Sequence, residues 1–392
     1  MGTSGRRAAA LAAVLLLAGC GPVVDRPVAD PAIPEASATP SPSTAPSASQ
    51  SAAPAPGTDF CAVPLPAAWR QRLTAGRIAV QPGETLTVHA VGDDGTTAIA
   101  DSRLGDARTV LFVRDGARRE VLRMADRDQL YGAGFDGRYL VFSISHDPSD
   151  LSSWTLYAWD ASTGGPPRLL ARNAVDGAGH PAPGPMLYPV VADGVAAWTA
   201  GRPDGTTELH RYTLMTGADE VVRAGHPGTP FLFGGELVWP ESARPDALTT
   251  LHAVALDSGA PAELPAALAA IRGPAFIAGT GTAAAWVDPD VHTLWVWRPT
   301  WPHPVRALRV AEGRNLQWVR VAGDLVTWDD GTAQFGADLR TGSYARLTPR
   351  YGYTVADGDA LAVGYAPAAK SGGGDPPTLV RVSDLPPLPA CP

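Results

Sequence analysis

The sequence predicts an all-β fold made of one small antiparallel sheet that is repeated along the chain. Apolar and polar residues alternate with a period of two, the alternating runs last only about 5–8 residues, and Gly, Asp and Pro bound them. The clearest example runs from Asp136 to Leu170, where an Asp-Gly turn precedes two alternating runs and a Ser-Thr-Gly-Gly turn precedes a third. One such sheet cannot bury both of its faces, whereas a ring of them can. We therefore predict a single β-propeller.

Turn-then-strand units recur at steps of about 34 to 57 residues, close to the length of one propeller blade. Counting them predicts seven blades, with six and eight left open. The expected blades span residues 85–124, 130–172, 186–224, 229–265, 274–310, 316–348 and 351–385. The last unit lacks a fourth strand, and the Pro-rich stretch after Leu385 cannot continue a ladder. Residues 77–80, after a short helix at 67–73, are expected to supply that strand and close the ring.

The second unit resembles the WD40-like repeat of TolB-type β-propellers. The resemblance rests on Asp136-Gly137, on the run from Leu140 to Phe142, on Leu156-Tyr157 and on the turn and strand from Asp160 to Leu170. It implies that the Asp-Gly turn joins two strands of a blade. As an architecture it extends over residues 85–385, although the units that begin at Gly234 and Gly281 lack the Asp.

The first residues of the chain predict export and lipid attachment. Arg6 and Arg7 precede an apolar run from Ala8 to Ala18, which is too short to span a bilayer and is typical of a secretory signal. The run ends in Leu-Ala-Gly-Cys20, which resembles the bacterial lipobox. That resemblance implies cleavage before Cys20 and attachment of diacylglycerol to it. We therefore expect a lipoprotein with a signal peptide over residues 1–19, anchored to the extracytoplasmic face of the cell membrane.

Composition divides the rest of the chain. Residues 20–57 begin with the lipidated Cys20 and continue as a stretch of mostly Pro, Ala, Ser and Thr, which cannot bury a core and is expected to be a disordered linker. The propeller is expected over residues 58–392, as a monomer. A net charge of −8 argues against nucleic-acid binding, which needs a basic surface.

The remaining two cysteines lie at the two ends of the predicted propeller. Export would place Cys61 and Cys391 in an oxidising compartment, where disulfides form and persist. Because Cys20 is assigned to the lipid, we predict a disulfide between Cys61 and Cys391.

Carboxylates recur in the loops that are expected to join the second and third strands of the units. They are Asp106, Asp147, Asp150, Asp204, Asp246, Asp288, Asp290, Asp329, Asp330 and Asp375. Propeller geometry brings these loops to one face, where a ring of carboxylates could attract a basic peptide, a polyamine or cations. Because Asp is also a common turn residue, a purely structural role stays open. Arg103, Arg202 and Arg244 lie in the same loops and would cancel part of the charge.

Tryptophans recur near the ends of second strands and are interpreted as wedges between neighbouring blades. They are Trp198, Trp239, Trp286 and Trp328. His210 and His252 occupy matching places in different units, so they are not expected to converge on a metal ion. The chain contains no nucleophile elbow, metalloprotease His pair or phosphate-binding Gly loop. Neither a catalytic residue nor a cofactor is therefore predicted.

These patterns favour a non-enzymatic, membrane-anchored propeller that binds a protein or peptide through one rim, by analogy at the level of the fold. Two alternatives stay open. One is a hydrolase or lactonase with carboxylates at the central channel. The other is a cell-wall glycan-binding protein with exposed tryptophans such as Trp301.

Overall fold

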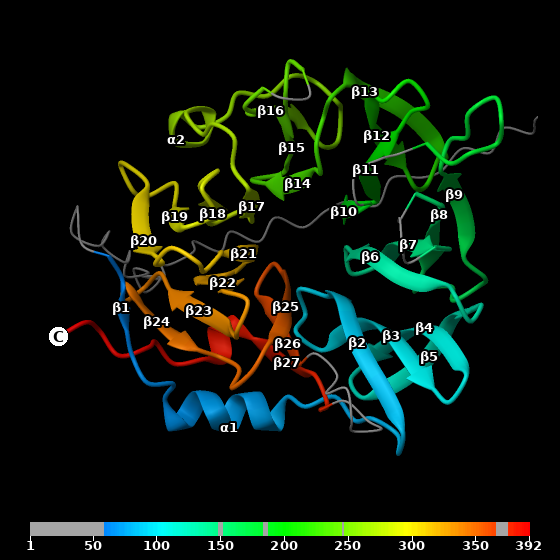
Figure 1. Ribbon diagram of the computed structural model, residues 1–392. Coiled ribbons are helices and arrows are strands. Elements are labelled where there is room, and N and C mark those ends of the chain that lie inside the picture. Colours follow the sequence, from blue (N-terminus) through cyan, green and yellow to red (C-terminus); the bar gives the residue numbers. More distant parts are fainter. Residues whose placement is uncertain (1–58, 148–151, 183–186, 245–246, 366–374) are drawn as a thin grey trace, which may run out of the picture. The chain divides into compact units, whose positions relative to one another are not determined.

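The computed structural model describes residues 59–147, 152–182, 187–244, 247–365 and 375–392. Within these residues the strands form seven sheets, which follow one another around an axis as the blades of a β-propeller (Figure 1). The predicted fold class and blade count are thereby confirmed. The predicted signal peptide and linker, residues 1–57, lie outside the described residues. In the described part of the chain, no helix has the length and apolar character needed to cross a membrane.

Blades 1, 2, 3 and 5 are four-stranded antiparallel sheets in which the strand nearest the axis comes first in the chain (Figure 1). Blade 1 contains β2 (Glu84–Val91), β3 (Thr97–Leu104), β4 (Ala107–Arg114) and β5 (Ala117–Met124). Blade 2 contains β6 (Gln129–Phe135), β7 (Tyr139–Ser145), β8 (Trp154–Asp160) and β9 (Arg168–Arg172). Blade 3 contains β10 (Val190–Ala192), β11 (Val195–Gly201), β12 (Thr207–Thr213) and β13 (Ala218–Gly225). Blade 5 contains β17 (Phe276–Gly279), β18 (Ala284–Val287), β19 (Thr293–Trp297) and β20 (Val305–Arg309).

Blade 4 is shorter at its outer edge. It contains β14 (Phe231–Phe233), β15 (Glu236–Glu241) and β16 (Thr250–Ala255). In the fourth position the described chain forms only an isolated bridge between Val254 and Pro261. Proline has no N–H to donate, so it cannot extend the ladder. The chain then enters the short helix α2 (Ala266–Ala269) before blade 5.

The N-terminal segment meets the outer edge of blade 7, but not as a full strand. Blade 7 contains β25 (Gly352–Asp357), β26 (Ala360–Tyr365) and β27 (Thr378–Arg381), and the 3₁₀ helix η1 (Val382–Asp384) follows. Arg77 forms one antiparallel bridge with Thr378, flanked by hydrogen bonds from Ile78 N to Pro377 O (2.8 Å) and from Leu379 N to Gly76 O (2.8 Å). The predicted strand at 77–80 was therefore right in its place and wrong in its extent. β27 is short and turns into η1, which leaves little edge to pair with.

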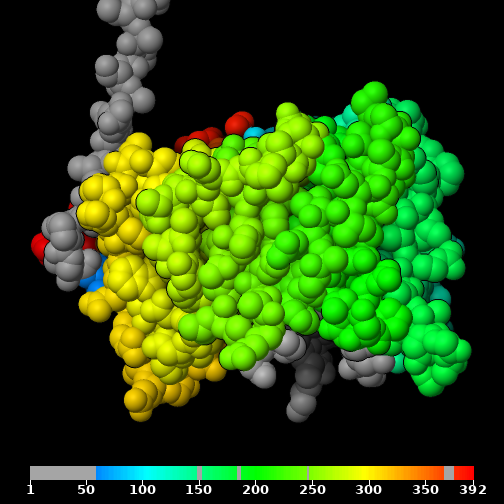
Figure 2. Space-filling view, turned by 90° about the horizontal axis from the view of Figure 1, so that it is seen from above, coloured from blue at the N-terminus to red at the C-terminus, as the bar shows by residue number. Residues whose placement is uncertain are grey.

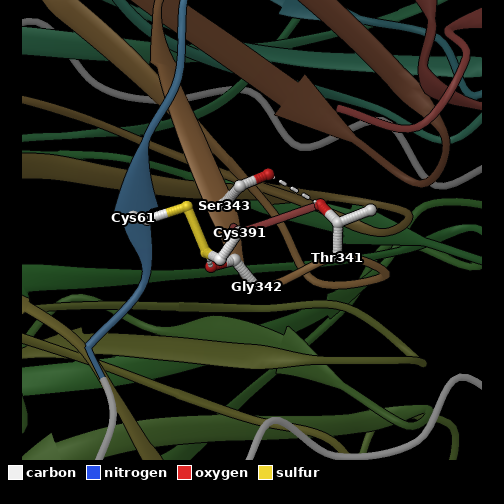
Figure 3. The surroundings of a disulfide bond; sticks show 5 residues. All are labelled: Cys61, Thr341, Gly342, Ser343 and Cys391. Carbon is white, nitrogen blue, oxygen red and sulfur yellow. Dashed lines mark hydrogen bonds between the residues drawn. A yellow bond between two sulfur atoms is a disulfide. The ribbon is translucent and has the colours of Figure 1, made fainter. Parts of the chain in front are cut away.

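A second N-terminal contact was not predicted. Blade 6 contains β21 (Gln317–Ala322), β22 (Leu325–Asp329), β23 (Gln334–Asp338) and β24 (Ser343–Arg346). β1 (Cys61–Ala62) adds to it as a fifth strand, parallel to β24. Cys61 also forms the predicted disulfide with Cys391, with 5.7 Å between their Cα atoms (Figure 3). The segments around Cys61 and Cys391 are therefore both held on blade 6.

The helix α1 (Ala67–Ala75) holds the C-terminal segment against the propeller. Its Trp69 is fully buried, and the indole Nε1 donates a hydrogen bond to Pro386 O at 2.7 Å. On the other side of this segment, Leu388 N donates to the buried carboxylate of Asp338 at 2.9 Å. The Pro-rich stretch, which cannot pair as a strand, is thus fixed by side chains.

Stacked pairs of aromatic rings between second and third strands recur in five blades. The pairs are Phe142–Tyr157, Trp198–His210, Trp239–His252, Trp286–Trp295 and Trp328–Phe335, with ring centroids 5.1 to 6.5 Å apart. The four tryptophans interpreted as wedges are all buried, which confirms that interpretation. His210 and His252 are partners of these rings on separate blades, where they serve packing.

Figure 2 shows the outer flank of the ring, with blades 3 to 5 in green to yellow. The outermost strand of blade 3, β13, exposes most of its residues. Blade 3 therefore leaves its polar outer strand largely to solvent.

Candidate functional site

The predicted rim carboxylates that the structure describes lie in or beside the loops between second and third strands. These residues are Asp106, Asp147, Asp204, Asp288, Asp290, Asp329, Asp330 and Asp375. Because consecutive strands are antiparallel, these loops share one face of the ring, here called the rim face. Asp150 and Asp246 lie outside the described residues.

Most of these carboxylates already have partners, either in their own loops or on neighbouring segments. Asp290 accepts a hydrogen bond from His292 N (3.0 Å) and pairs with Arg309 (3.1 Å). Asp330 accepts a hydrogen bond from Thr332 N in the same turn (3.0 Å) and pairs with Arg314 (3.0 Å). The hydrogen bond from His292 N lowers the pKa of the Asp290 carboxyl, as bonds to the charged form do. This arrangement supports the structural role of Asp as a turn residue and weakens the case for an open acidic ring.

A group of aromatic side chains at the axis was not predicted. On the rim face the inner strands begin, because each inner strand runs antiparallel to the second strand that ends there. Tyr131 of β6, Tyr188 just before β10, Phe276 of β17 and Trp318 of β21 all lie near these beginnings and are partly exposed. We call these four residues the aromatic collar.

The contacts between the collar side chains cross the circle of blades. The ring centroids of Tyr131 and Tyr188 are 5.2 Å apart, those of Tyr188 and Trp318 are 6.3 Å apart, and those of Phe276 and Trp318 are 5.5 Å apart. Tyr188 belongs to blade 3 and Trp318 to blade 6, which are not neighbours in the ring. Only side chains that reach the axis can touch across it, so the collar lies across the axis on the rim face.

The backbone at Trp318 is strained. Its φ is +51°, a left-handed conformation that is costly for a bulky residue. The ladder between β21 and β22 shifts register in the same place, between Gln317 and Arg320. Trp318 and Arg320 are both partly exposed while Val319 between them is buried. Such strain clusters at functional sites in proteins, which makes this bulge a candidate site.

Arg320 lies beneath the collar without a carboxylate partner. Its guanidinium carbon is 6.0 Å from the centre of the Trp318 ring, and Nη1 donates to Val319 O at 2.9 Å. No carboxylate of the described residues lies within ion-pair distance of it. Desolvation by the surrounding protein lowers the pKa of Arg320, and the nearby Tyr188 and Asp329 offset this in part. A guanidinium nevertheless stays charged at neutral pH, so the site holds an unpaired cation.

Asp329 lies near enough to Arg320 to attract its charge, and His89 lies beside Tyr131 of the collar. Burial raises the pKa of the Asp329 carboxyl, and its Oδ2 has no hydrogen-bond partner among the described residues. His89 of β2 shares a hydrogen bond with Tyr131 O across the blade 1–blade 2 seam at 3.2 Å. Burial lowers the pKa of His89, so its imidazole is neutral at pH 7. Neither group neutralises the arginine fully.

The other end of the axis is acidic. The inner turns on this face are linked between blades by hydrogen bonds from Asp359 N to Asp93 Oδ1 (2.6 Å) and from Gly194 N to Asp136 Oδ2 (2.8 Å). Gly358 has φ +51°, and a Cβ there would lie 2.0 Å from Asp93 Oδ1, so only glycine fits this close approach. Asp357 is the last residue of the inner strand β25 and therefore lies at this end of the axis. Water reaches Asp357, yet dense surrounding protein and the charges of Asp93 and Asp136 raise its pKa to about 7.

Asp357→Asn is expected to remove part of the pH dependence of stability. The folded chain holds the pKa of Asp357 at about 7, above its value of about 4 in the unfolded chain. Between these pH values the folded state binds more protons than the unfolded state, so the contribution of Asp357 to stability falls as pH rises through this window. Asn is neutral at every pH. The Tm of the variant should therefore exceed that of the wild type more at pH 8 than at pH 5.

Thermal unfolding followed by circular dichroism at both pH values measures this difference. Asp106→Asn, which removes an exposed carboxylate from the rim face, controls for the loss of one surface charge. An Asp357→Asn variant that changes Tm equally at pH 5 and pH 8 would contradict the prediction.

The features that would favour the two alternative functions are missing from the described residues. In this part of the chain no group of three or more His, Cys, Asp or Glu side chains converges so as to hold a metal ion. Trp301, named as an exposed tryptophan for glycan binding, is buried at 3% exposure, because it packs into the core between blades. The exposed Trp301 that would have favoured glycan binding is therefore not found.

Two surface pockets lie away from the axis. One, of about 590 Å³, is lined by α1, Arg340 and residues 383–387. The other, of about 360 Å³, includes Arg138 and Asp160. Two of the four arginines that line these pockets are paired, Arg340 with Asp338 and Arg138 with Asp160. The collar combines four aromatic side chains from four blades with Arg320, and we take it as the better candidate for a binding site.

Fold and site together define this chain as a seven-bladed β-propeller with four aromatic side chains in contact near its axis on one face. No family model and no curated protein sequence matches it. A solved chain from a study of two prolyl endopeptidases superposes with a TM-score of 0.52 and 16% identity, over 83% of this chain and 50% of the other. This chain thus spans half the length of that relative.

Two further solved structures are similar. Oligogalacturonate lyase from Vibrio parahaemolyticus gives a TM-score of 0.49 at 9% identity, over 78% of this chain and 93% of the lyase. TolB from Acinetobacter baumannii gives 0.34 at 10% identity, over 67% of this chain and 53% of TolB. At such identities a structural likeness shows the fold alone.

Proposed function

We propose that this protein is a lipid-anchored, extracytoplasmic propeller that binds a protein or peptide partner at the aromatic collar and catalyses no reaction. The observation that carries the proposal is the collar itself, with four partly exposed aromatic rings gathered from four blades around an unpaired arginine. Aromatic residues and Arg are the residue types that dominate the energy of protein interfaces. The rim carboxylates of the surrounding loops would form the polar margin of this site.

The membrane anchor rests on the lipobox-like sequence at Leu17 to Cys20. The disulfide between Cys61 and Cys391 supports export, because disulfides persist in oxidising compartments. Diacylglycerol on Cys20 supplies two acyl chains, enough for stable anchoring, whereas one chain binds only marginally. The propeller would then bind its partner outside the cytoplasm. We propose that it does so as a monomer.

Lipid attachment is tested with the full chain in the cells that produce it. The wild type should incorporate labelled palmitate and sediment with membranes. Cys20→Ala should lose both properties, whereas Cys61→Ala should keep the label. Equal labelling of the wild type and Cys20→Ala would refute the anchor.

Partner binding is tested by photo-crosslinking in the same cells. A photoreactive residue, p-benzoylphenylalanine, replaces Tyr131 in the collar of the full chain. The control carries it at Met215, which is 76% exposed in the turn between β12 and β13 on the opposite face. We expect a discrete protein adduct from position 131 that is missing from position 215. Equal adducts from both positions, or none from position 131, would overturn the proposal.

A further inference from the structure

We propose that Arg320 is the anchor of this site and that it binds a carboxylate of the partner peptide at the axis. This inference rests on the proposed function, because it takes the ligand to be a peptide. It adds the chemical group that the ligand must carry and the residue that recognises it.

The first argument is charge. Many of the arginines on the propeller surface are paired, as Arg314 is with Asp330 and Arg350 with Asp375. Among the described residues, the contacts of the Arg320 side chain are a backbone carbonyl and the face of Trp318. A guanidinium presents five N–H donors in a planar fork that matches a carboxylate. An anion that enters the axis would therefore find unused donors at this position.

The second argument is the failure of the nearest acid to neutralise Arg320. The Asp329 carboxylate is buried at 1% exposure and accepts a hydrogen bond from Gly331 N at 3.0 Å. It contributes an attraction to Arg320 without coming within ion-pair distance. Keeping the charges of Arg320 and Asp329 apart in a poorly solvated place is unfavourable. A ligand carboxylate beside Arg320 would give the guanidinium the ion-pair partner that Asp329 does not provide.

The third argument is shape and polarity. Trp318 and Phe276 lie on one side of the axis and Tyr131 and Tyr188 on the other, so apolar ring surfaces flank the approach to Arg320. A carboxylate next to an apolar side chain fits this combination. The C-terminus of a peptide offers it, and so does an Asp or Glu side chain beside an apolar residue.

The test uses the full chain and a random tetrapeptide library prepared in two forms, with free C-terminal carboxylates and with C-terminal amides. Binding is followed by Trp fluorescence and by calorimetry on the selected peptides. We expect carboxylate-bearing peptides to be selected, and Arg320→Gln to weaken them by about tenfold or more, as for a lost charge-assisted hydrogen bond. Arg320→Lys, which keeps the charge and loses the planar fork, should weaken them by less.

Arg314→Gln is the matched control, because it removes an arginine that lies near the rim face of the same blade and is already paired with Asp330. It should leave the affinity within about twofold of the wild type, well below the loss from one such bond. Circular dichroism melts of each variant confirm folding. If selected peptides lose affinity when amidated, the terminal carboxylate is the ligand group. If amidated peptides that contain Asp or Glu bind as well as the free acids, the side-chain carboxylate is the ligand group. Both results support the proposal.

Three results would overturn it. Peptides that bind the wild type and Arg320→Gln equally would remove Arg320 from the site and leave the proposed function standing. Binding of a galacturonic acid trimer in place of any peptide would assign the arginine to a sugar acid. A wild-type chain that binds no peptide, alongside an adduct from position 131 in cells, would limit the site to folded proteins without a carboxylate anchor. If that adduct is missing as well, the proposed function falls with the inference.

Discussion

Replacing both cysteines (Cys61→Ser with Cys391→Ser) is expected to lower the free energy of unfolding by up to about 5–6 kcal/mol. The disulfide joins residues separated by 330 positions. In the chain-entropy model, a crosslink over so long a loop strongly restricts the unfolded chain, and residual structure in that chain makes the figure an upper bound. The effect should be large here because the N-terminal segment completes blade 7 with only a single bridge at Arg77.

Denaturant unfolding of the full chain, followed by Trp fluorescence, measures the loss. A reducing agent should bring the wild type to the midpoint of the double variant and leave the double variant unchanged. Equal midpoints for the wild type and the double variant without reductant would show that the hydrogen bonds of Trp69 and Asp338 hold the chain ends unaided.

Trp328→Ala is expected to cost about 3–5 kcal/mol of stability, the range found for removal of a large buried aromatic side chain. Trp328 is 2% exposed and packs against Phe335 and Tyr344, each with ring centroids 5.7 Å away. Removal leaves a cavity in the core that blade 6 shares with blade 5. Because interiors are closely packed, the neighbouring rings cannot fill that space.

The same unfolding experiment measures this cost, and Trp295→Ala provides the control. Trp295 occupies the stacked pair of blade 5 but is partly exposed, so its removal opens a smaller cavity and should cost clearly less. Equal losses for the two variants would contradict the assignment of Trp328 as a core wedge.

Local patterns were enough to predict the fold. Period-two alternation and Gly and Asp turns specify short antiparallel strands wherever they occur, because each strand pairs with its neighbour in sequence. Seven such units therefore imply seven blades. The buried tryptophans of the second strands were also predicted, because a residue that recurs at one place in several units packs in the same way in each of them.

The candidate site shows where such reasoning ends. The four residues of the aromatic collar do not stand out in any one unit of the sequence. The only signal for them was an aromatic residue near the start of several inner strands. The predicted rim carboxylates lie in the expected loops, yet partners such as Arg309 and Arg314 neutralise several of them.

The sequence by itself determined the all-β class, favoured seven blades over six or eight, and predicted the pairing of Cys61 with Cys391, since these follow from local periodicity and from the position of the two cysteines. Only the tertiary structure decided that β1 joins blade 6, that Trp318 takes a left-handed conformation and that Arg320 has no carboxylate partner among the described residues. The reason is physical. These features depend on contacts between blades that are distant in sequence and meet only when the ring is closed around its axis.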